Sequence, residues 1–334
     1  MPDPWNDPDR KGEAMDDRMM TAVLYDRYGG PEVLCTTRVP RPEPAPGEIL
    51  VKVHAFSVNG IETTVRNGRL RLLTGRTFPQ RIGLDFAGEV AATGAGVVGF
   101  VPGDRVWGIL GRSSFGSAAE YVTVPSERAG PVPDGLDLVE AATLPVATTA
   151  VTALRDKARL RPGERLLVRG AAGGVGNAAV QLGRAYGAQV TGLARAANLD
   201  FVRALGAHRA VDHRSVRPAE LGRFDVVLDT VGTDPRDWRR LLRPGGRMVT
   251  IAFDTRRPVA WLGSVAASTV HGRGRVRYFA GNPKREHFDD LARHVRQGLL
   301  RPVVDRVFPL EETAAAHAAL EAGGVRGKYV VQVV

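Results

Sequence analysis

A glycine-rich turn between an apolar run and a helical pattern carries the clearest chemistry in this chain. The run at 166–168 has no polar alternation, which predicts a strand buried on both faces. Against the pattern G-x-G-x-x-G, Ala171 replaces the first glycine, while Gly173 and Gly176 occupy the second and third places. Such a turn lets a pyrophosphate approach the backbone and the positive end of the helix dipole. We therefore predict a dinucleotide site at Ala172, Gly173, Gly174 and Val175, with an ordinary strand-to-helix turn as the alternative.

The residue after the next predicted strand, at 189–194, indicates which dinucleotide binds. In an NAD-binding unit an Asp or Glu at this strand end accepts hydrogen bonds from the ribose. Here the strand is followed by Arg195, and the next acid is Asp200, inside a helical pattern. A guanidinium pairs with the 2′-phosphate that a carboxylate would repel, so NADPH is predicted. Arg195 is alternatively a solvated arginine. His213, after the third strand pattern, is a second candidate for contact with the adenine or its phosphate, or a surface histidine.

The elements that must position this turn form a repeated strand–helix pattern. Six strand patterns between residues 164 and 281 alternate with helices or crossovers, which predicts a doubly wound α/β domain with a six-stranded parallel sheet. Residues 138–160 are predicted to be helical, and a further helix is predicted to end in the segment LLRPGG at 241–246.

The residues on either side of this α/β pattern have a different character. Short β-rich runs punctuated by Gly and Pro precede it, and two helices with a closing strand follow it. We therefore predict a disordered leader at 1–18, a discontinuous β-rich, barrel-like domain at 19–133 and 282–334, and an inserted nucleotide-binding domain at 134–281.

Several segments follow one another along the chain: AVLYDRYGGPEVL, GLDFAGEV, PGDRVWG, GAAGGVGNAAVQL, DVVLDTVG and GKYVVQV. Together and in this order they resemble the medium-chain dehydrogenase/reductase superfamily, within it the zinc-independent quinone oxidoreductase and enoyl reductase branch. The likeness extends from Met20 to Val334 and implies a GroES-like first domain around a Rossmann domain. Zinc-dependent members hold a catalytic metal with a Cys and a His; Leu84 stands where that histidine would be, and Cys35, the single cysteine, lies in an early strand. No metal is therefore expected.

The resemblance also implies contacts between this chain and a bound nicotinamide. Thr149 is expected near the carboxamide, although a helix threonine often bonds its own backbone instead. Ile251, Ala252 and Phe279 would line the ring after the fifth and sixth strands, or serve only as core, and Lys328 would come close to the cofactor. Without a metal, conjugate hydride transfer from NADPH to an enone, enoyl thioester or quinone needs only hydrogen-bond donors and a proton source.

The predicted substrate loop departs from the family pattern Asn-Pro-x-Asp followed by Arg and an aromatic residue. Asn59 and Arg66 are kept, but Gly60 replaces the proline, Glu62 replaces the aspartate, and no tyrosine follows. Asn59, Thr64 and Arg66 are the catalytic candidates, and water, Thr64 or a residue outside this loop could supply the proton. Alternatively, Glu62 and Arg66 form a structural pair that holds the loop.

Composition and net charge limit which other classes of function the chain could have. The chain has 334 residues and a formal net charge of +10, but only 5 of its 46 basic residues are lysine, and the arginines are scattered. A solvated basic surface is favoured over a nucleic-acid site. No apolar stretch approaches the roughly 18 residues that would span a bilayer, so no membrane partner is expected. The single cysteine fits a reducing compartment, and the cytoplasm is predicted.

The sequence also allows two alternative functions, and it predicts an oligomeric state. A secondary-metabolite tailoring enzyme on the same scaffold, a polyketide-type reductase or a non-redox cyclase, would explain the altered loop. A nucleic-acid-binding or structural protein could also retain the fold. The strand pattern at 275–280 would be an exposed edge in a monomer, which predicts a homodimer paired through that edge.

Overall fold

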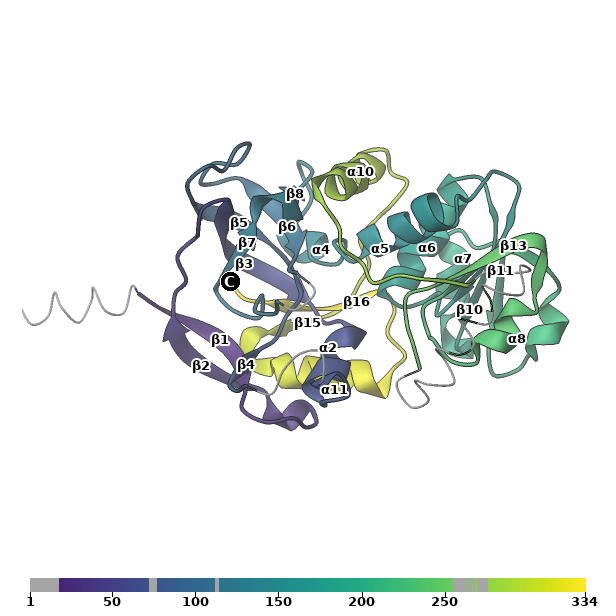
Figure 1. Cartoon of the computed structure of the whole chain (residues 1–334), viewed down its shortest axis with the longest axis horizontal. Helices are drawn as coiled ribbons and strands as arrows, with labels where there is room; N and C mark the ends of the chain where they lie inside the picture. The colour runs from purple at the N-terminus through teal and green to yellow at the C-terminus, as the bar shows by residue number, and fades with distance from the viewer. Residues whose placement is uncertain are drawn as a thin grey trace, which may run out of the picture.

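The computed structural model describes residues 18–71, 77–111, 114–254, 263, 266, 268 and 276–334, so the predicted leader lies outside the described residues apart from Arg18. Figure 1 shows two sheet-based units side by side, with α4 (Leu138–Ala141) and α5 (Ala147–Val151) between them. One buried apolar cluster includes residues of both sheets and of these two helices. Among the described residues, none of the helices has the length and hydropathy needed to cross a membrane.

A six-stranded, fully parallel sheet forms the first unit, as predicted. Its spatial order is β11-β10-β9-β12-β13-β14, the order of a doubly wound dinucleotide-binding fold. The apolar run that predicted the first strand is completely buried. The strands are β9 (Arg165–Arg169), β10 (Gln189–Ala194), β11 (Arg209–Asp212), β12 (Phe224–Asp229), β13 (Leu242–Thr250) and β14 (Val276–Tyr278).

Two predicted helices differ from the observed ones. The predicted helical region at 138–160 is divided into α4, α5 and a π-helical segment at Thr152–Lys157, because Pro145 lacks the N–H that would continue the first helix. The helix predicted to end in LLRPGG was also placed wrongly. It ends at Arg239, and β13 already begins at Leu242, since Pro244 and Gly245, with φ of 77°, do not fit a helix. The helices of this unit are α6 (Gly174–Ala185), α7 (Leu199–Ala204) and α8 (Pro235–Arg239).

The second unit is built on a seven-stranded, mostly antiparallel sheet. Its order is β15-β16-β3-β5-β6-β8, with β7 also paired to β3, and a separate three-stranded sheet has the order β2-β1-β4. β3 (Glu48–Ser57) and β5 (Asp85–Thr93) form its centre. The other strands are β1 (Met19–Tyr25), β2 (Cys35–Pro40), β4 (Gln80–Arg81), β6 (Arg105–Ile109), β7 (Tyr121–Pro125), β8 (Ala129–Pro131), β15 (Val304–Pro309) and β16 (Lys328–Gln332).

The C-terminal segment returns to this second unit, as the sequence predicted. α10 (Arg285–Arg296) packs on β8 and α5, and α11 (Thr313–Ala322) packs beside α2 (Gly60–Arg66) and β16. Figure 1 shows β16 in the middle of the molecule, and its first residues lie next to the parallel-sheet unit. Strand β16 therefore places residues near the C-terminus at the boundary between the two units, beside residues that are far from them in the sequence. Short 3₁₀ turns occupy Pro31–Val33, Ser126–Arg128, Ala196–Asn198, Pro218–Leu221 and Leu310–Glu312.

Candidate active site

The glycine-rich turn connects β9 to α6 and leaves the start of that helix open. Gly170 has φ of 72°, and a Cβ on it would lie 2.4 Å from Thr230 Oγ1. A Cβ on Gly176 would lie 2.0 Å from the Gly170 carbonyl oxygen, so glycine is required at both positions. Gly173 is the N-cap of α6 and no side chain caps the helix. The first N–H groups of α6 are therefore available to an anion.

Gly173 differs from the other glycines of the turn because the fold leaves room for a side chain there. Its φ of −78° and ψ of 176° suit any residue. A Cβ on Gly173 would meet only the Gly170 oxygen, at 3.6 Å, which is ordinary contact. Nothing within the described chain demands glycine at this point, whereas a ligand approaching the backbone would.

The second unit contacts this turn through Gly327 and Lys328. The Gly327 N–H donates to the Ala172 carbonyl at 2.7 Å, and Gly173 and Gly327 form an isolated parallel bridge. The stem of Lys328 crosses Gly174 so closely that a Cβ on that glycine would lie 2.6 Å from Lys328 Cδ. Lys328 thus reaches the glycine turn from the neighbouring domain.

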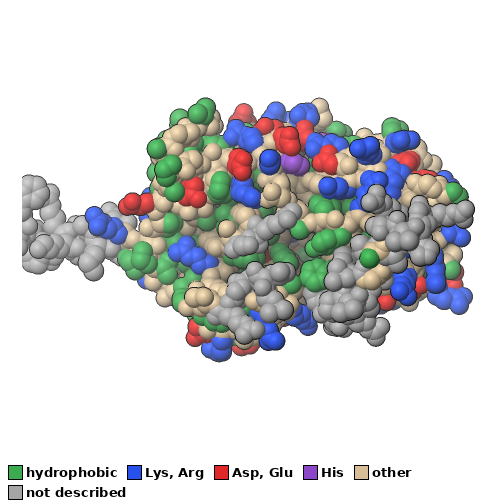
Figure 2. Space-filling model, in the orientation of Figure 1, with side chains coloured by type: hydrophobic (Ala, Val, Ile, Leu, Met, Phe, Trp, Pro, Cys, Tyr) green, Lys and Arg blue, Asp and Glu red, His purple; other side chains and the backbone are tan. Residues whose placement is uncertain are grey.

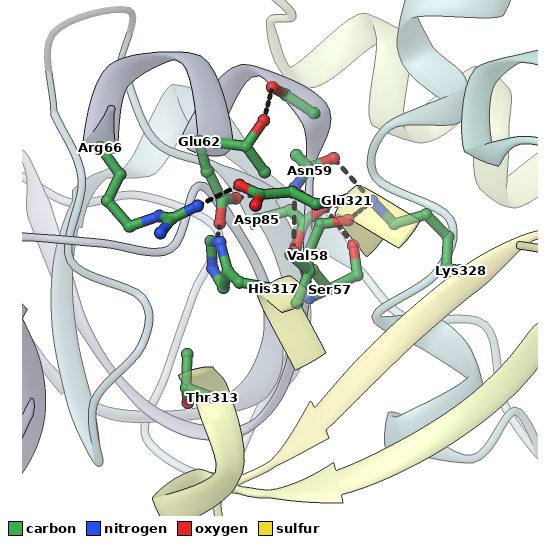
Figure 3. Close-up of polar contacts among 12 residues, drawn as sticks. Ser57, Val58, Asn59, Glu62, Arg66, Asp85, Thr313, His317, Glu321 and Lys328 are labelled. Carbon is green, nitrogen blue, oxygen red and sulfur yellow. Dashed lines mark hydrogen bonds and ion pairs between the residues drawn. The ribbon is translucent and has the colours of Figure 1, made fainter. Parts of the chain in front are cut away.

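The ammonium group of Lys328 lies in a buried polar cluster (Figure 3). Its Nζ donates to the Val58 carbonyl at 2.8 Å and to Asn59 Oδ1 at 2.6 Å, and lies 3.9 Å from Asp85 Oδ2. Asp85 accepts from the Ser57 N–H at 2.7 Å and from its hydroxyl at 2.5 Å. Burial lowers the pKa of Lys328, and the nearby carboxylates of Asp85 and Glu62 act in the opposite direction. Asp85 is therefore the counter-charge that keeps an ammonium tolerable here.

Asn59 connects this ammonium to α2. Its Nδ2 lies within hydrogen-bond distance of three acceptors, the Ser57 carbonyl at 2.9 Å, Glu62 Oε1 at 3.0 Å and Asp85 Oδ2 at 3.0 Å. Asn59 therefore presents its nitrogen to acceptors and its oxygen to the Lys328 ammonium. Of the predicted catalytic residues, Asn59 is the one that the structure brings together with Lys328.

The other two catalytic candidates, Arg66 and Thr64, face different partners. Arg66 is completely buried, forms an ion pair with Glu321 of α11 and donates to the Gly29 carbonyl at 3.4 Å. The Thr64 hydroxyl donates to the Gly60 carbonyl at 3.2 Å, within its own helix. The alternative that Glu62 pairs with Arg66 is wrong, because each instead contacts α11.

Glu62 contacts α11 through His317. Glu62 Oε2 lies 3.5 Å from His317 Nε2, and both side chains are fully buried. Burial and then Asp85 raise the pKa of Glu62 to about 8, whereas burial and then Arg66 lower the pKa of His317 to about 3. Both groups are consequently neutral near pH 7, so their contact is not an ion pair.

The residues expected around a nicotinamide follow the carboxyl ends of the strands. The Ile251 N–H donates to Asp229 O at 3.1 Å, and the Phe279 N–H to Thr250 O at 3.4 Å. Ala252 follows Ile251, and its carbonyl accepts from the Thr250 hydroxyl at 2.8 Å. The two hydrogen bonds of the Ile251 and Phe279 N–H groups extend β13 and β14 by one residue each.

Thr149 lies on α5, and its hydroxyl would be 3.2 Å from a Cβ on Gly281. The neighbouring Thr148 and Thr152 hydroxyls donate to backbone carbonyls of the preceding turn, those of Pro145 at 2.6 Å and Thr148 at 2.9 Å. The Thr149 hydroxyl has no hydrogen bond within the part of the chain that is described. It does not bond a carbonyl of the preceding turn, unlike its neighbours.

Arg195 and His213 lie together after β10 and β11. The His213 N–H donates to Ala194 O at 3.1 Å, and the ring Nδ1 is 2.8 Å from the same oxygen. Arg195 is exposed beside a glycine pair, and a Cβ on Gly323 would lie 2.5 Å from its Nη2. No hydrogen bond or ion pair of its guanidinium is found in the described ranges.

Sequence reasoning missed four polar members of this site. Asp85 and His317 each left a signal, since a carboxylate stands in an apolar strand and a histidine in an alanine-rich helix. Ser57 and Glu321 left none. Over the described positions, no three His, Cys, Asp or Glu side chains gather in a group that could hold a metal ion.

Comparisons with known proteins agree with this architecture. The family model for the alcohol dehydrogenase GroES-like domain matches residues 45–134, and the family model described as zinc-binding dehydrogenase matches 205–331. The chloroplastic quinone-oxidoreductase QR1 of Triphysaria versicolor is 32% identical over 94% of this chain and 99% of its own length. The human mitochondrial NAD(P)H oxidoreductase RTN4IP1 is 33% identical over 95% of this chain and 90% of its own.

Solved structures give the same result. The quinone oxidoreductase from Coxiella burnetii superposes with a TM-score of 0.86 at 31% identity, covering 95% of this chain and all (100%) of the other. The Escherichia coli quinone oxidoreductase complexed with NADPH has a TM-score of 0.81 at 26% identity, covering 94% and 100%. The chain belongs to the medium-chain dehydrogenase/reductase superfamily of oxidoreductases, in its quinone oxidoreductase-like branch.

Proposed function

We propose that this oxidoreductase is an NADPH-dependent, zinc-independent reductase of quinones or α,β-unsaturated carbonyl compounds. One observation carries the proposal. The bridge between Gly173 and Gly327 sets the Asn59–Lys328 pair against an uncapped glycine turn at the carboxyl edge of the parallel sheet. That edge is where doubly wound folds bind nucleotides.

The residues at the turn fit a dinucleotide. The vacant space at a Gly173 Cβ and the free N–H groups of α6 suit a pyrophosphate, and Ala172, Gly174 and Val175 would complete its cradle. Arg195 is exposed and has no partner among the described residues, and His213 lies beside it, which supports a 2′-phosphate and hence NADPH. When bound, the nucleotide would supply a hydride from its nicotinamide ring.

The ring itself would be held by residues after the strand ends. The free Thr149 hydroxyl supports a hydrogen bond to the carboxamide, and Ile251, Ala252 and Phe279 follow β13 and β14 at the same edge. Thr149 would fix the orientation of the ring, and the three other residues would exclude water from one of its faces.

Conjugate reduction develops negative charge on the substrate oxygen, and this chain can stabilise it with a cation. Two of the three N–H donors of Lys328 are engaged, by Val58 and Asn59, so one remains for a ligand. In a buried setting such a donor is worth more than in water. Leu84 replaces the histidine that a zinc-dependent relative would use, which supports chemistry without that metal.

The substrate class follows from this chemistry and from the relatives that are named quinone oxidoreductases. We also propose a homodimer, because β14 is the last strand of the parallel sheet among the described residues and a second copy could pair with it. On the face in Figure 2 basic and acidic side chains are interspersed, which favours a small-molecule substrate over a nucleic acid. A cytoplasmic location stays a prediction, since relatives include chloroplastic and mitochondrial proteins.

The direct test is NADPH oxidation by the purified protein with a panel of quinones and enones, in the presence of a metal chelator. We expect turnover with at least one quinone or enone, unaffected by the chelator. Turnover that is lost with chelator and restored by Zn²⁺ would contradict zinc independence. Absence of turnover across a broad panel would contradict the reductase assignment.

A further inference from the structure

Two buried groups, Glu62 and His317, face each other with polar atoms that lack hydrogen bonds. Glu62 Oε2 and both ring nitrogens of His317 are fully buried and have no hydrogen-bond partner within the described chain. The shortest approach is 3.5 Å, between Glu62 Oε2 and His317 Nε2 (Figure 3). Buried polar atoms without partners cost free energy, so these facing atoms require an explanation.

The charges around the pair are already balanced without it. Asp85 of β5 faces Lys328 of β16, and Arg66 of α2 pairs with Glu321 of α11. Each of these contacts joins one negative and one positive group. An ionised Glu62 would add an uncompensated negative charge next to Asp85, and a protonated His317 would add a positive charge near Arg66. The neutral forms of both groups are favoured for this reason and because of burial.

Glu62 helps to orient Asn59 through its other oxygen, together with the Ser57 carbonyl and Asp85. Oε1 accepts from Asn59 Nδ2 at 3.0 Å, which leaves Asn59 Oδ1 facing the Lys328 ammonium at 2.6 Å. The amide is held in this orientation only while its nitrogen side meets acceptors. The carboxyl group of Glu62 therefore influences the Lys328 ammonium indirectly, through the side-chain amide of Asn59.

We propose that Glu62 and His317 are positioning residues, which hold one proton between Glu62 Oε2 and His317 Nε2 and thereby orient Asn59 and the ammonium of Lys328 at the glycine turn. The proton resides on the carboxyl oxygen and is donated to the imidazole nitrogen, so no net charge is buried. This inference rests on the proposed function, since Lys328 matters for activity only if a nucleotide and substrate bind beside it.

The proposal predicts an alkaline decline of activity. Because the pKa of Glu62 is raised to about 8, its proton is present below that pH and lost above it. Ionised Glu62 then competes with Asp85 for the hydrogen bonds of Asn59 and for the ammonium of Lys328. As a result kcat/KM should fall with rising pH, by up to about tenfold per pH unit. Lys328 also has a lowered pKa and contributes its own ionisation, so the two must be separated by substitution.

Glu62→Gln separates them, because glutamine keeps both the acceptor for Asn59 and a donor for His317 but does not titrate. We expect the alkaline limb of kcat/KM, scaled to each variant's own plateau, to move to higher pH in Glu62→Gln and to stay unchanged in Glu312→Gln. Glu312 is the matched control, an exposed glutamate at the start of the facing helix α11 whose side chain does not cap that helix. An alkaline limb in Glu62→Gln that superimposes on that of the unmodified protein would overturn the proposal.

A spectroscopic measurement tests the shared proton without any activity. Infrared spectra at neutral pH should contain a protonated carboxylic acid band that disappears in Glu62→Gln and persists in Glu312→Gln. In His317→Phe the band should shift, because the carboxyl proton loses its acceptor. Absence of the Glu62-dependent band would overturn the proposal even if the reductase assay succeeds. Its presence in a protein that reduces nothing would show that the proton is held while the proposed function fails.

Discussion

Replacing Gly173 by alanine adds one methyl group where the proposed nucleotide would approach the backbone. In the ligand-free protein that methyl meets one oxygen at 3.6 Å, with backbone angles that suit alanine. Lower entropy of the unfolded chain favours alanine by about 0.4–1 kcal/mol, while alanine is the poorer N-cap by a similar amount. The two effects offset each other, so the free energy of unfolding should change by less than about 1 kcal/mol.

The effect on NADPH should be much larger. A methyl group between the turn and a pyrophosphate would break one charge-assisted hydrogen bond, worth about 1.5–3 kcal/mol. The Kd for NADPH should therefore rise about 10- to 150-fold. The measurements are fluorescence titration with NADPH and unfolding in urea, both on the same preparation.

Gly176→Ala is the matched control. Its Cβ would lie 2.0 Å from Gly170 O and 2.9 Å from Ala171 Cα, so it should lower the free energy of unfolding by at least about 2 kcal/mol. Unaltered NADPH affinity in a stable Gly173→Ala variant would refute the reasoning. The reasoning would also be refuted if Gly173→Ala lost as much stability as Gly176→Ala.

Two further substitutions test the nicotinamide contact and the core. Thr149→Val should raise the Kd for NADPH about 2- to 10-fold with little change in stability. Thr148→Val, which removes a hydroxyl bonded to the Pro145 carbonyl, should lower the free energy of unfolding and leave the Kd nearly unchanged; equal effects of the two variants in titration and urea unfolding would contradict this. Arg169→Leu leaves buried Asp229, 2.8 Å from the guanidinium, without its partner. It should cost about 3 kcal/mol at pH 7. The pKa of Asp229 is already raised by burial, so the loss should shrink as pH falls and the group is protonated; a loss in urea unfolding independent of pH would contradict this.

The parallel sheet and the glycine turn could be predicted because their signals are local. An apolar run without alternation is enough to indicate a strand buried on both faces, and the turn follows it directly. The helices at 138–160 and near LLRPGG were harder, since Pro145 and Pro244 act against an otherwise helical apolar pattern. In both cases a local backbone constraint outweighed periodicity.

The polar cluster could be predicted only in part. Asn59 and Lys328 were named from family likeness, but their contact joins residues 269 positions apart. The i, i+4 spacing of Glu62 and Arg66 suggested a pair, yet α11 supplies a closer partner for each. Such tertiary contacts depend on how α2 and α11 pack, which the spacing of charges along one helix does not reveal.

Calorimetric titration of the protein with NADPH and NADH, repeated on Arg195→Ala, tests the central claim most directly. The unmodified protein should bind NADPH more tightly than NADH. Because Arg195 is exposed and screened by solvent, Arg195→Ala should raise the Kd for NADPH by about tenfold and leave that for NADH within about twofold. No binding of either nucleotide, or NADH bound as tightly as NADPH, would contradict the account.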